Sequence, residues 1–252
     1  MKRRIVFITD CRDVAYNELR VATFNELDKL NPDHSIEIEP VVAVKPFSLI
    51  NGSFLLRLMA ESYPDETVFS VILNPSKIRP ERLIGRTKSK NFFFTGTNTG
   101  VFDWFLRDFG ISELYELNDP GFVPFGGKCV HAPAVARIAS GVEFLKLGIP
   151  FSADKLKKLD IFPGVVLHVD NFGLIKFNTT LPKLNEGQIL SVRINGHSVS
   201  AVHTKRMMSR ESGEWVVYTG SSLRLAELGK VRQNGAEEIG VKEGDLVAIS
   251  VN

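Results

Sequence analysis

The segment "FSVILNPSKIRPER", residues 69–82, decides how the first half of the chain is organised. Its apolar run is rich in β-branched residues, as is typical of a buried strand, and the run stops at Asn74. In open α/β sheets, the loops after the strands deliver side chains to a binding site. The segment therefore predicts a strand that presents an amide at a site, with basic side chains directly beyond it. These basic residues are Lys77, Arg79 and Arg82.

Strand and helix signals alternate on both sides of this segment. The expected strands are residues 4–10, 36–44, 67–73 and 91–96, and the expected helices are residues 17–30, 48–63, 100–110 and 132–148. Such alternation predicts an α/β domain with a largely parallel sheet flanked by helices.

After about residue 160 the pattern changes to short strands separated by Gly, Asn and Pro turns. The strand signals lie in residues 164–178, 189–194, 197–205, 214–220, 221–228 and 244–251. Without a further long helix, this pattern predicts a small all-β, barrel-like domain. The expected domains are therefore residues 1–160 and 161–252.

Composition narrows the class of protein. The 252 residues are 44% apolar and 24% charged with a net charge of +2, so the chain is globular and its charge gives no support for a nucleic-acid partner. The two Cys and five His lack metal-ligand spacing, so we expect no metal. We find neither a signal peptide nor about 18 consecutive apolar residues, so we expect a cytoplasmic protein that does not span a membrane.

Two carboxylates stand at the ends of predicted strands. Asp10 ends the first strand, where a carboxylate can accept hydrogen bonds from ribose hydroxyls or can cap the following segment. Asp170 and Phe172 end a strand of the second domain, where they could hold an ammonium group and stack a flat base. The alternative for Asp170 is an Asx turn before Gly173.

Six segments resemble, in order, the motifs of the S-adenosylmethionine hydroxide adenosyltransferases, relatives of the fluorinating and chlorinating enzymes. The family motifs are an Ile-Thr-Asp strand, a series from Pro-Pro-Phe-Asp to Val-Val-Asp-Pro-Gly, Pro-Asp-Asn-Gly-Leu, Phe-His-Gly-Arg-Asp-Ile-Phe-Ala-Pro, Asp-x-Phe-Gly-Asn and a closing segment. The matching segments are residues 4–10, 45–76, 92–102, 124–141, 169–178 and 220–249.

This resemblance implies a function and a set of binding residues. The family cleaves S-adenosylmethionine to adenosine and methionine, with water attacking the ribose 5′ carbon and no separate cofactor. It implies a homotrimer that binds this small adenosyl ligand between the N-terminal domain of one subunit and the C-terminal domain of its neighbour. Asp10 would hold the ribose hydroxyls, Asp170 the methionine amine and Ser221 the methionine carboxylate, with Ser222 beside it near the adenine.

The departures from the family concern the groups that activate water. The family's Asp is Asn74, its Arg position reads Glu81 with Arg79 and Arg82 as neighbours, and its His is Gly126. Because an amide cannot accept a proton from water, we expect weak hydrolysis unless Glu81 points inward and acts as a base. A missing imidazole at Gly126 would leave space for a larger nucleophile or a halide.

Two further positions leave the function open. The family's adenine-reading Asn is Leu174 here, and His131 lies five residues after the expected His position. The alternatives to a weak hydrolase are therefore a non-catalytic paralogue that binds an adenosyl ligand, or an adenosyltransferase that uses a halide or another nucleophile.

Overall fold

The chain forms two compact units in the computed structural model. The structure describes residues 3–33, 35–73, 80–118 and 120–251, and the two units are Met1–Leu159 (unit 1) and Asp160–Asn252 (unit 2). Throughout these described ranges, no helix combines the length and the apolar character needed to cross a membrane.

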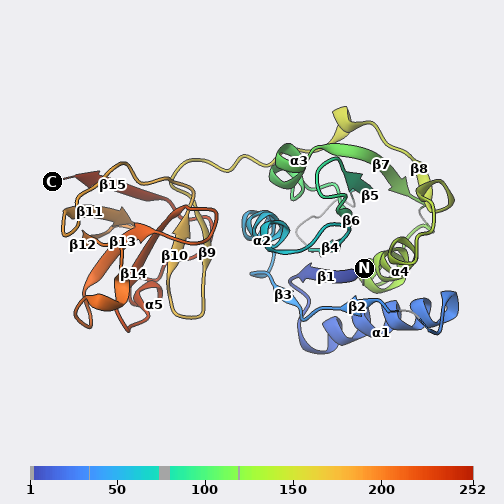
Figure 1. Ribbon diagram of the computed structural model, residues 1–252, viewed down its shortest axis with the longest axis horizontal. Helices are drawn as coiled ribbons and strands as arrows, with labels where there is room; N and C mark the ends of the chain where they lie inside the picture. Colours follow the sequence, from blue (N-terminus) through green and yellow to red (C-terminus); the bar gives the residue numbers. More distant parts are fainter. Residues whose placement is uncertain (1–2, 34, 74–79, 119, 252) are drawn as a thin grey trace. The chain divides into compact units, whose positions relative to one another are not determined.

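Unit 1 is built on one sheet with a parallel half and an antiparallel half (Figure 1). Its strands are β1 (Arg4–Thr9), β2 (Glu37–Ile38), β3 (Val42–Ala43), β4 (Val68–Ile72), β5 (Arg82–Thr87), β6 (Phe93–Thr97), β7 (Ile111–Leu117) and β8 (Gly148–Pro150). Strand β1 is parallel to β2, β3 and β4, and β4 is parallel to β6. Strands β5, β7 and β8 continue the sheet in antiparallel pairs. The α/β architecture expected from the alternation is confirmed.

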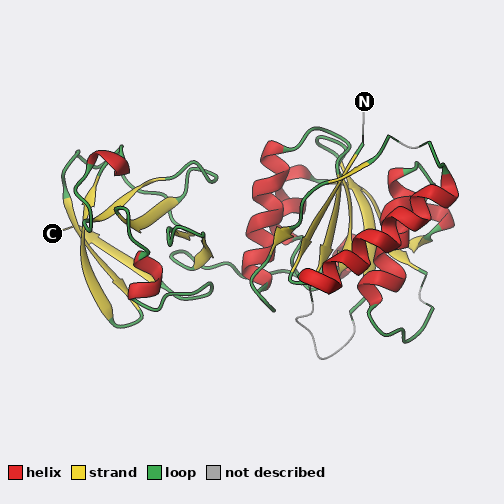
Figure 2. Ribbon diagram, turned by 90° about the horizontal axis from the view of Figure 1, so that it is seen from below, coloured by secondary structure: helices red, strands yellow, loops and turns green. Residues whose placement is uncertain are grey.

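Helices cover both faces of this sheet (Figure 2). They are α1 (Asp13–Leu30), α2 (Leu49–Ser62), α3 (Asp103–Phe109) and α4 (Ala132–Ala139), the last preceded by a π-helical turn, Gly127–His131. On one face, Leu19 of α1 and Val135 of α4 share a core with Phe7 of β1. On the other face, Phe105 of α3 packs edge to face against Phe69 of β4. Burial on both faces explains the continuous apolar runs of the parallel strands.

The structure corrects three expected elements. The strand expected over residues 221–228 begins only at Ala226, because Leu223 and Arg224 take positive φ values in a turn. The helix expected over residues 132–148 ends at Ala139, because Gly141 takes a φ of +84° and the chain then makes a 3₁₀ turn, Phe144–Lys146. The strand expected over residues 36–44 is divided into β2 and β3, with Pro40 between them.

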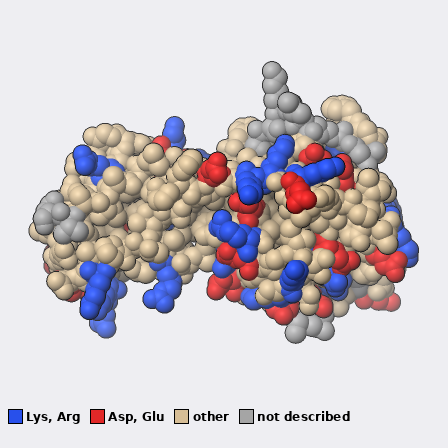
Figure 3. Space-filling model, turned by 90° about the horizontal axis from the view of Figure 1, so that it is seen from above, with Lys and Arg blue, Asp and Glu red and all other residues tan. Residues whose placement is uncertain are grey.

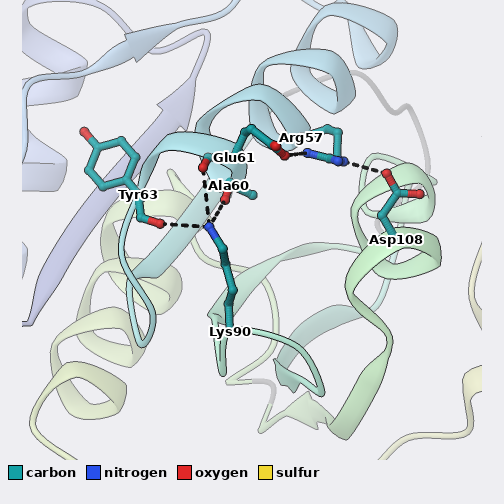
Figure 4. Close-up of polar contacts among 6 residues, drawn as sticks. All are labelled: Arg57, Ala60, Glu61, Tyr63, Lys90 and Asp108. Carbon is teal, nitrogen blue, oxygen red and sulfur yellow. Dashed lines mark hydrogen bonds and ion pairs between the residues drawn. The ribbon is translucent and has the colours of Figure 1, made fainter. Parts of the chain in front are cut away.

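Polar contacts fix the C-terminal end of α2 (Figure 4). The Lys90 ammonium donates to the carbonyl oxygens of Ala60 at 3.2 Å and Tyr63 at 3.4 Å. One turn earlier, the Arg57 guanidinium donates to the Asp108 carboxylate of α3 at 2.6 Å. A cation at a helix C-terminus satisfies exposed carbonyl groups and opposes the helix dipole, so these contacts hold α2 against the sheet and α3.

Charges on unit 1 are mixed in sign. On the face shown in Figure 3, basic and acidic side chains are interspersed over the larger unit. Ion pairs join Arg86 to Glu113 at 2.7 Å and Lys128 to Glu18 at 2.6 Å. Such exposed pairs contribute at most about 1 kcal/mol each, so they matter less to stability than the two apolar faces of the sheet.

Unit 2 is a curled sheet of short strands. They are β9 (Val166–Val169), β10 (Ile175–Phe177), β11 (Ile189–Ile194), β12 (His197–His203), β13 (Trp215–Thr219), β14 (Ala226–Lys230) and β15 (Val247–Val251), with one short helix, α5 (Gly235–Glu238). The strand order is β15-β11-β12-β13-β14-β10-β9, and only β12 and β13 are parallel among the described strand pairs of this sheet. Amides of Val166 and Val247 donate at 2.8 Å to the carbonyls of Asp245 and Gly164, which joins the two edges. The barrel-like fold is confirmed.

Candidate functional site

The first candidate region is one edge of the unit 1 sheet. The parallel strands β1, β4 and β6 all end there, and Asp10 directly follows β1. Because β5 runs antiparallel to β6, its first residue, Arg82, pairs with Thr97 at the end of β6 and lies at the same edge. This is the edge at which open α/β sheets bind ligands. Asn74 and Arg79 lie outside the described residues.

The Asp10 carboxylate is tied to the loop that leads into α2. Its Oδ2 atom accepts a hydrogen bond from the amide of Phe47 at 3.0 Å, and Phe47 has a φ of +61°. Helix α1 begins after Arg12 without a side-chain cap, so Asp10 does not cap the helix that follows it. The half-buried carboxylate therefore holds a strained backbone position at the sheet edge, as is common at binding sites.

The Glu81 carboxylate is committed to structural contacts. Asn98 donates to it from Nδ2 at 3.1 Å, and the Asn98 amide donates to the Glu81 carbonyl at 2.8 Å. A hydrogen bond from the amide of Glu81 itself holds the pKa of this carboxyl below its usual value, helped by Asn98 and by Lys157. A carboxylate with a lowered pKa is a weak base, which makes Glu81 a poor acceptor for a proton from water.

Arg82 occupies the space beside Gly126. The Arg82 side chain is buried, with the residue 7% exposed, and a Cβ atom built on Gly126 would lie 2.8 Å from its Nη2 atom. The space that the sequence suggested for a larger nucleophile is thus filled by a guanidinium group. Gly126 follows Phe125, which has a φ of +55°, and it opens into the π-helical turn. Such turns occur frequently at functional sites.

His131 lies deep in the same region, at the end of the π-helical turn. The residue is 3% exposed, and its Nδ1 atom lies 3.0 Å from the hydroxyl of Thr95 on β6. Its Nε2 atom is buried and makes no hydrogen bond within the described part of the chain. Burial, together with the positive charge of Arg82, lowers the pKa of His131 to about 3. The imidazole is therefore neutral near pH 7 and is a weak base.

A second candidate region lies in unit 2, where Asp170 follows β9. Its Oδ1 atom accepts hydrogen bonds from the amides of Phe172 and Leu174, both at 3.0 Å, which forms the Asx turn considered above. Its Oδ2 atom accepts a hydrogen bond from the Lys176 ammonium at 3.2 Å. The Phe172 ring is 70% exposed beside this turn. Asp170 is thus a rigidly oriented carboxylate that already has a cationic partner.

A row of four side chains crosses unit 2 next to Asp170. In the register of β9, β10, β14 and β13, Lys176 lies opposite both His168 and Glu227, and Glu227 lies opposite Tyr218. The Lys176 ammonium is 3.2 Å from Glu227 Oε1, and the Tyr218 hydroxyl donates to Glu227 Oε2 at 2.9 Å. Burial and the negative charge of Glu227 raise the pKa of Tyr218, so this phenol stays protonated.

Gly220 brings the serine segment against this row. A Cβ atom at Gly220 would lie 2.0 Å from Glu227 Oε1, so only glycine admits the carboxylate at this position. Ser221 and Ser222 come directly after it, the first exposed and the second buried. The structure therefore brings Asp170 and the Ser221-Ser222 turn to one charged cluster. Lys176, Glu227 and Tyr218 were not among the expected site residues; charged residues within buried strands were the available signal.

Comparison with known proteins identifies a family and a fold. The family model described as SAM hydroxide adenosyltransferase N-terminal domain matches residues 5–148. A crystal structure of an uncharacterized conserved protein from Thermotoga maritima matches with a TM-score of 0.83 and 22% identity, over 98% of this chain and all of that chain (100%). A conserved hypothetical protein from Thermus thermophilus matches with a TM-score of 0.76 and 21% identity, over 98% and 100% of the two chains. These two structures share the two-domain fold.

Proposed function

The chain belongs to the SAM hydroxide adenosyltransferase family, and from this premise we propose that it cleaves S-adenosylmethionine slowly to adenosine and methionine. Family membership indicates binding of S-adenosylmethionine and a function of the adenosyltransferase type. One contrast carries the finer proposal. Carboxylates that can hold the ligand remain at strand ends, as Asp10 and Asp170, whereas the described groups near the attacking nucleophile are weak bases.

The two halves of the site contact different parts of the ligand. Asp10 accepts hydrogen bonds from the ribose hydroxyls with the carboxylate oxygen that does not bind Phe47. Asp170 and Ser221 meet the amino-acid end, Ser222 lies near the adenine, and the exposed Phe172 ring stacks on the base. The ligand binds between the Asp10 edge of one subunit and the Asp170 cluster of a neighbouring subunit in a homotrimer. S-adenosylmethionine is the substrate, and the reaction uses no separate cofactor.

The chemistry needs little from the protein beyond orientation. The water oxygen forms a bond to the ribose 5′ carbon while the carbon–sulfur bond breaks. The electron pair stays on sulfur, methionine leaves as a neutral thioether, and one proton passes to solvent. Because a sulfonium is a good leaving group, positioning and exclusion of bulk water can supply much of the rate. Asn74, Glu81 and the neutral His131 are poor proton acceptors, so hydrolysis is slow.

A second candidate function uses an anionic nucleophile. A halide carries no proton to remove, so the weak bases described above would not limit its attack on the ribose 5′ carbon. A halide would form 5′-halo-5′-deoxyadenosine and methionine. A protein that binds the adenosyl ligand without turnover is the remaining outcome.

Product analysis tests these proposals. The purified protein is incubated with S-adenosylmethionine, with and without chloride, and adenosine, 5′-chloro-5′-deoxyadenosine and methionine are measured by mass spectrometry. We expect adenosine and methionine in equal amounts at a low rate. Chlorinated product would support the halide route. Binding of S-adenosylmethionine without any product would leave only the binding function, and absence of binding would overturn the proposal. Light scattering tests the trimer.

A further inference from the structure

The cluster in unit 2 contains one more carboxylate than it has cations. Lys176 lies between Asp170 and Glu227, with its ammonium 3.2 Å from an oxygen of each. Among the ion pairs of the described residues, neither carboxylate contacts a second cation. Lys176 is 8% exposed and Glu227 is 4% exposed, so water screens this imbalance poorly. The cluster can therefore accept one further positive charge.

The two carboxylates hold Lys176 in different ways. The ammonium donates a hydrogen bond to Asp170 Oδ2, whereas its contact with Glu227 Oε1 is an ion pair without hydrogen-bond geometry. That oxygen of Glu227 is buried and makes no hydrogen bond within the described part of the chain. A buried acceptor without a hydrogen bond raises the free energy of the folded protein. If Lys176 moved a short way toward Glu227, the hydrogen bond formed there would offset the loss of its bond to Asp170.

Asp170 can keep its place without Lys176. Its Oδ1 atom is fixed by the amides of Phe172 and Leu174, so its orientation does not depend on the lysine. The Lys176 stem is flexible, whereas both carboxylates are held by other groups, Glu227 by the Tyr218 hydroxyl. The lysine is the part of the cluster that can move.

We propose that Lys176 is a specificity-determining residue whose ammonium stands in for the ammonium of the ligand at Asp170. This inference rests on the proposed binding of an adenosyl amino acid in this family. When the ligand's α-ammonium binds Asp170, Lys176 loses its hydrogen bond to Asp170 and keeps its ion pair with Glu227. The ligand must displace a cation of the same kind, so its ammonium adds little to the affinity of the natural protein.

Binding of two ligands by the full-length protein tests the proposal. Isothermal titration compares S-adenosylmethionine with its desamino analogue, in which hydrogen replaces the α-ammonium. The ratio of the two dissociation constants measures what the ammonium contributes. We expect the analogue to bind about threefold more weakly than S-adenosylmethionine in the natural protein.

Two substitutions should move this ratio in opposite directions. Lys176→Met removes the competing cation, and the ratio should rise about tenfold. Glu227→Gln keeps the shape of the side chain and an acceptor for Tyr218, but it leaves Lys176 with Asp170 as its remaining anionic partner, so the ratio should fall to about one. Lys183→Met, at an exposed lysine of the same unit, should leave the ratio unchanged.

The outcomes separate this inference from the proposed function. An unchanged ratio in Glu227→Gln and in a folded Lys176 variant overturns the inference alone, because a purely structural lysine would alter both dissociation constants equally. If circular dichroism shows that Lys176→Met is unfolded, Lys176→Gln replaces it, and Glu227→Gln is decisive by itself. If neither compound binds the natural protein, the proposed function and this inference both fail.

Discussion

Each half of the candidate site buries a cation, but the two cations have different surroundings. Lys176 in unit 2 lies between two carboxylates, whereas Arg82 in unit 1 lies beside Gly126, and its positive charge helps to lower the pKa of the His131 imidazole. Carboxylates that hold an ammonium suit the recognition of a charged ligand end. Under the proposed function, the unit 2 region binds the charged end of the ligand and the unit 1 region carries the reaction.

The largest difference between the two halves should appear when their glycines are replaced. Gly220→Ala should lower the free energy of unfolding by about 2–3 kcal/mol, because its Cβ atom would overlap the fixed carboxylate of Glu227. Gly126→Ala should cost less than about 1 kcal/mol, since it meets only the end of the flexible Arg82 side chain. Urea unfolding measures both. Equal losses would contradict the view that the unit 2 cluster is the more rigid one.

The next largest effect is the pH dependence that His131 gives to unit 1. The pKa of His131 is about 3 in the folded chain against 6.5 for an ordinary histidine, so the unfolded chain binds a proton first as the pH falls. Stability from this residue is complete above about pH 6.5 and is lost toward pH 3. Between pH 7 and pH 5 the loss should be about 2 kcal/mol. His131→Gln should remove this part of the pH dependence. Urea unfolding at pH 7 and pH 5 gives the free energy of unfolding of both proteins. An equal loss between the two pH values in both proteins would refute the prediction.

A third set of substitutions reintroduces the family's water-activating residues at positions 74 and 126. Asn74→Asp, at a position outside the described residues, should raise adenosine release about tenfold by restoring a carboxylate. Adding Gly126→His should lower the rate again, because even its Cβ atom approaches Arg82 to 2.8 Å. S-adenosylmethionine binding serves as the control for an intact site. A further rise in the double variant would mean that Arg82 moves aside.

The smallest effect is expected at Glu81. Glu81→Gln should change the rate of adenosine release less than about threefold, because the carboxylate is held by Asn98 and is a weak base. The measurement is the rate of adenosine release at saturating S-adenosylmethionine. A loss of tenfold or more would identify Glu81 as the base that accepts the proton from water. The attacking water would then lie near Glu81 and not near Arg82.

Much of the fold could be predicted because apolar runs and turn residues mark its elements. Strands β5, β7 and β8 were missed, and all three belong to the antiparallel half of the unit 1 sheet. Strand β5 begins with a buried arginine, which is unusual for a buried strand. Its Gly85 makes room for the ring of Phe94 on the neighbouring strand, and the local sequence around Gly85 does not reveal this contact. Strand β7 carries polar residues, such as Glu113 and Glu116, that hide its alternation.

The candidate site was predictable only where it follows strand ends. Asp10 and Asp170 stand directly after strands, so their positions could be inferred from pattern. Lys176, Glu227 and Tyr218 come together through the register of three antiparallel strands, and a shift by one residue would turn them to the other face. Likewise, no local pattern in the sequence brings Arg82 to Gly126, 44 positions along the chain, because that approach depends on the packing of unit 1.

The joined edges of unit 2 limit how another chain can attach to this unit. Hydrogen bonds from Val166 and Val247 occupy backbone groups that an open sheet would leave unpaired. An unpaired strand edge is a template on which another chain can add a strand, which is a common route to aggregation. Where the edges of unit 2 meet, that route is closed. Any contact of this region with another chain is therefore made through side chains, whose identity can vary without disturbing the sheet.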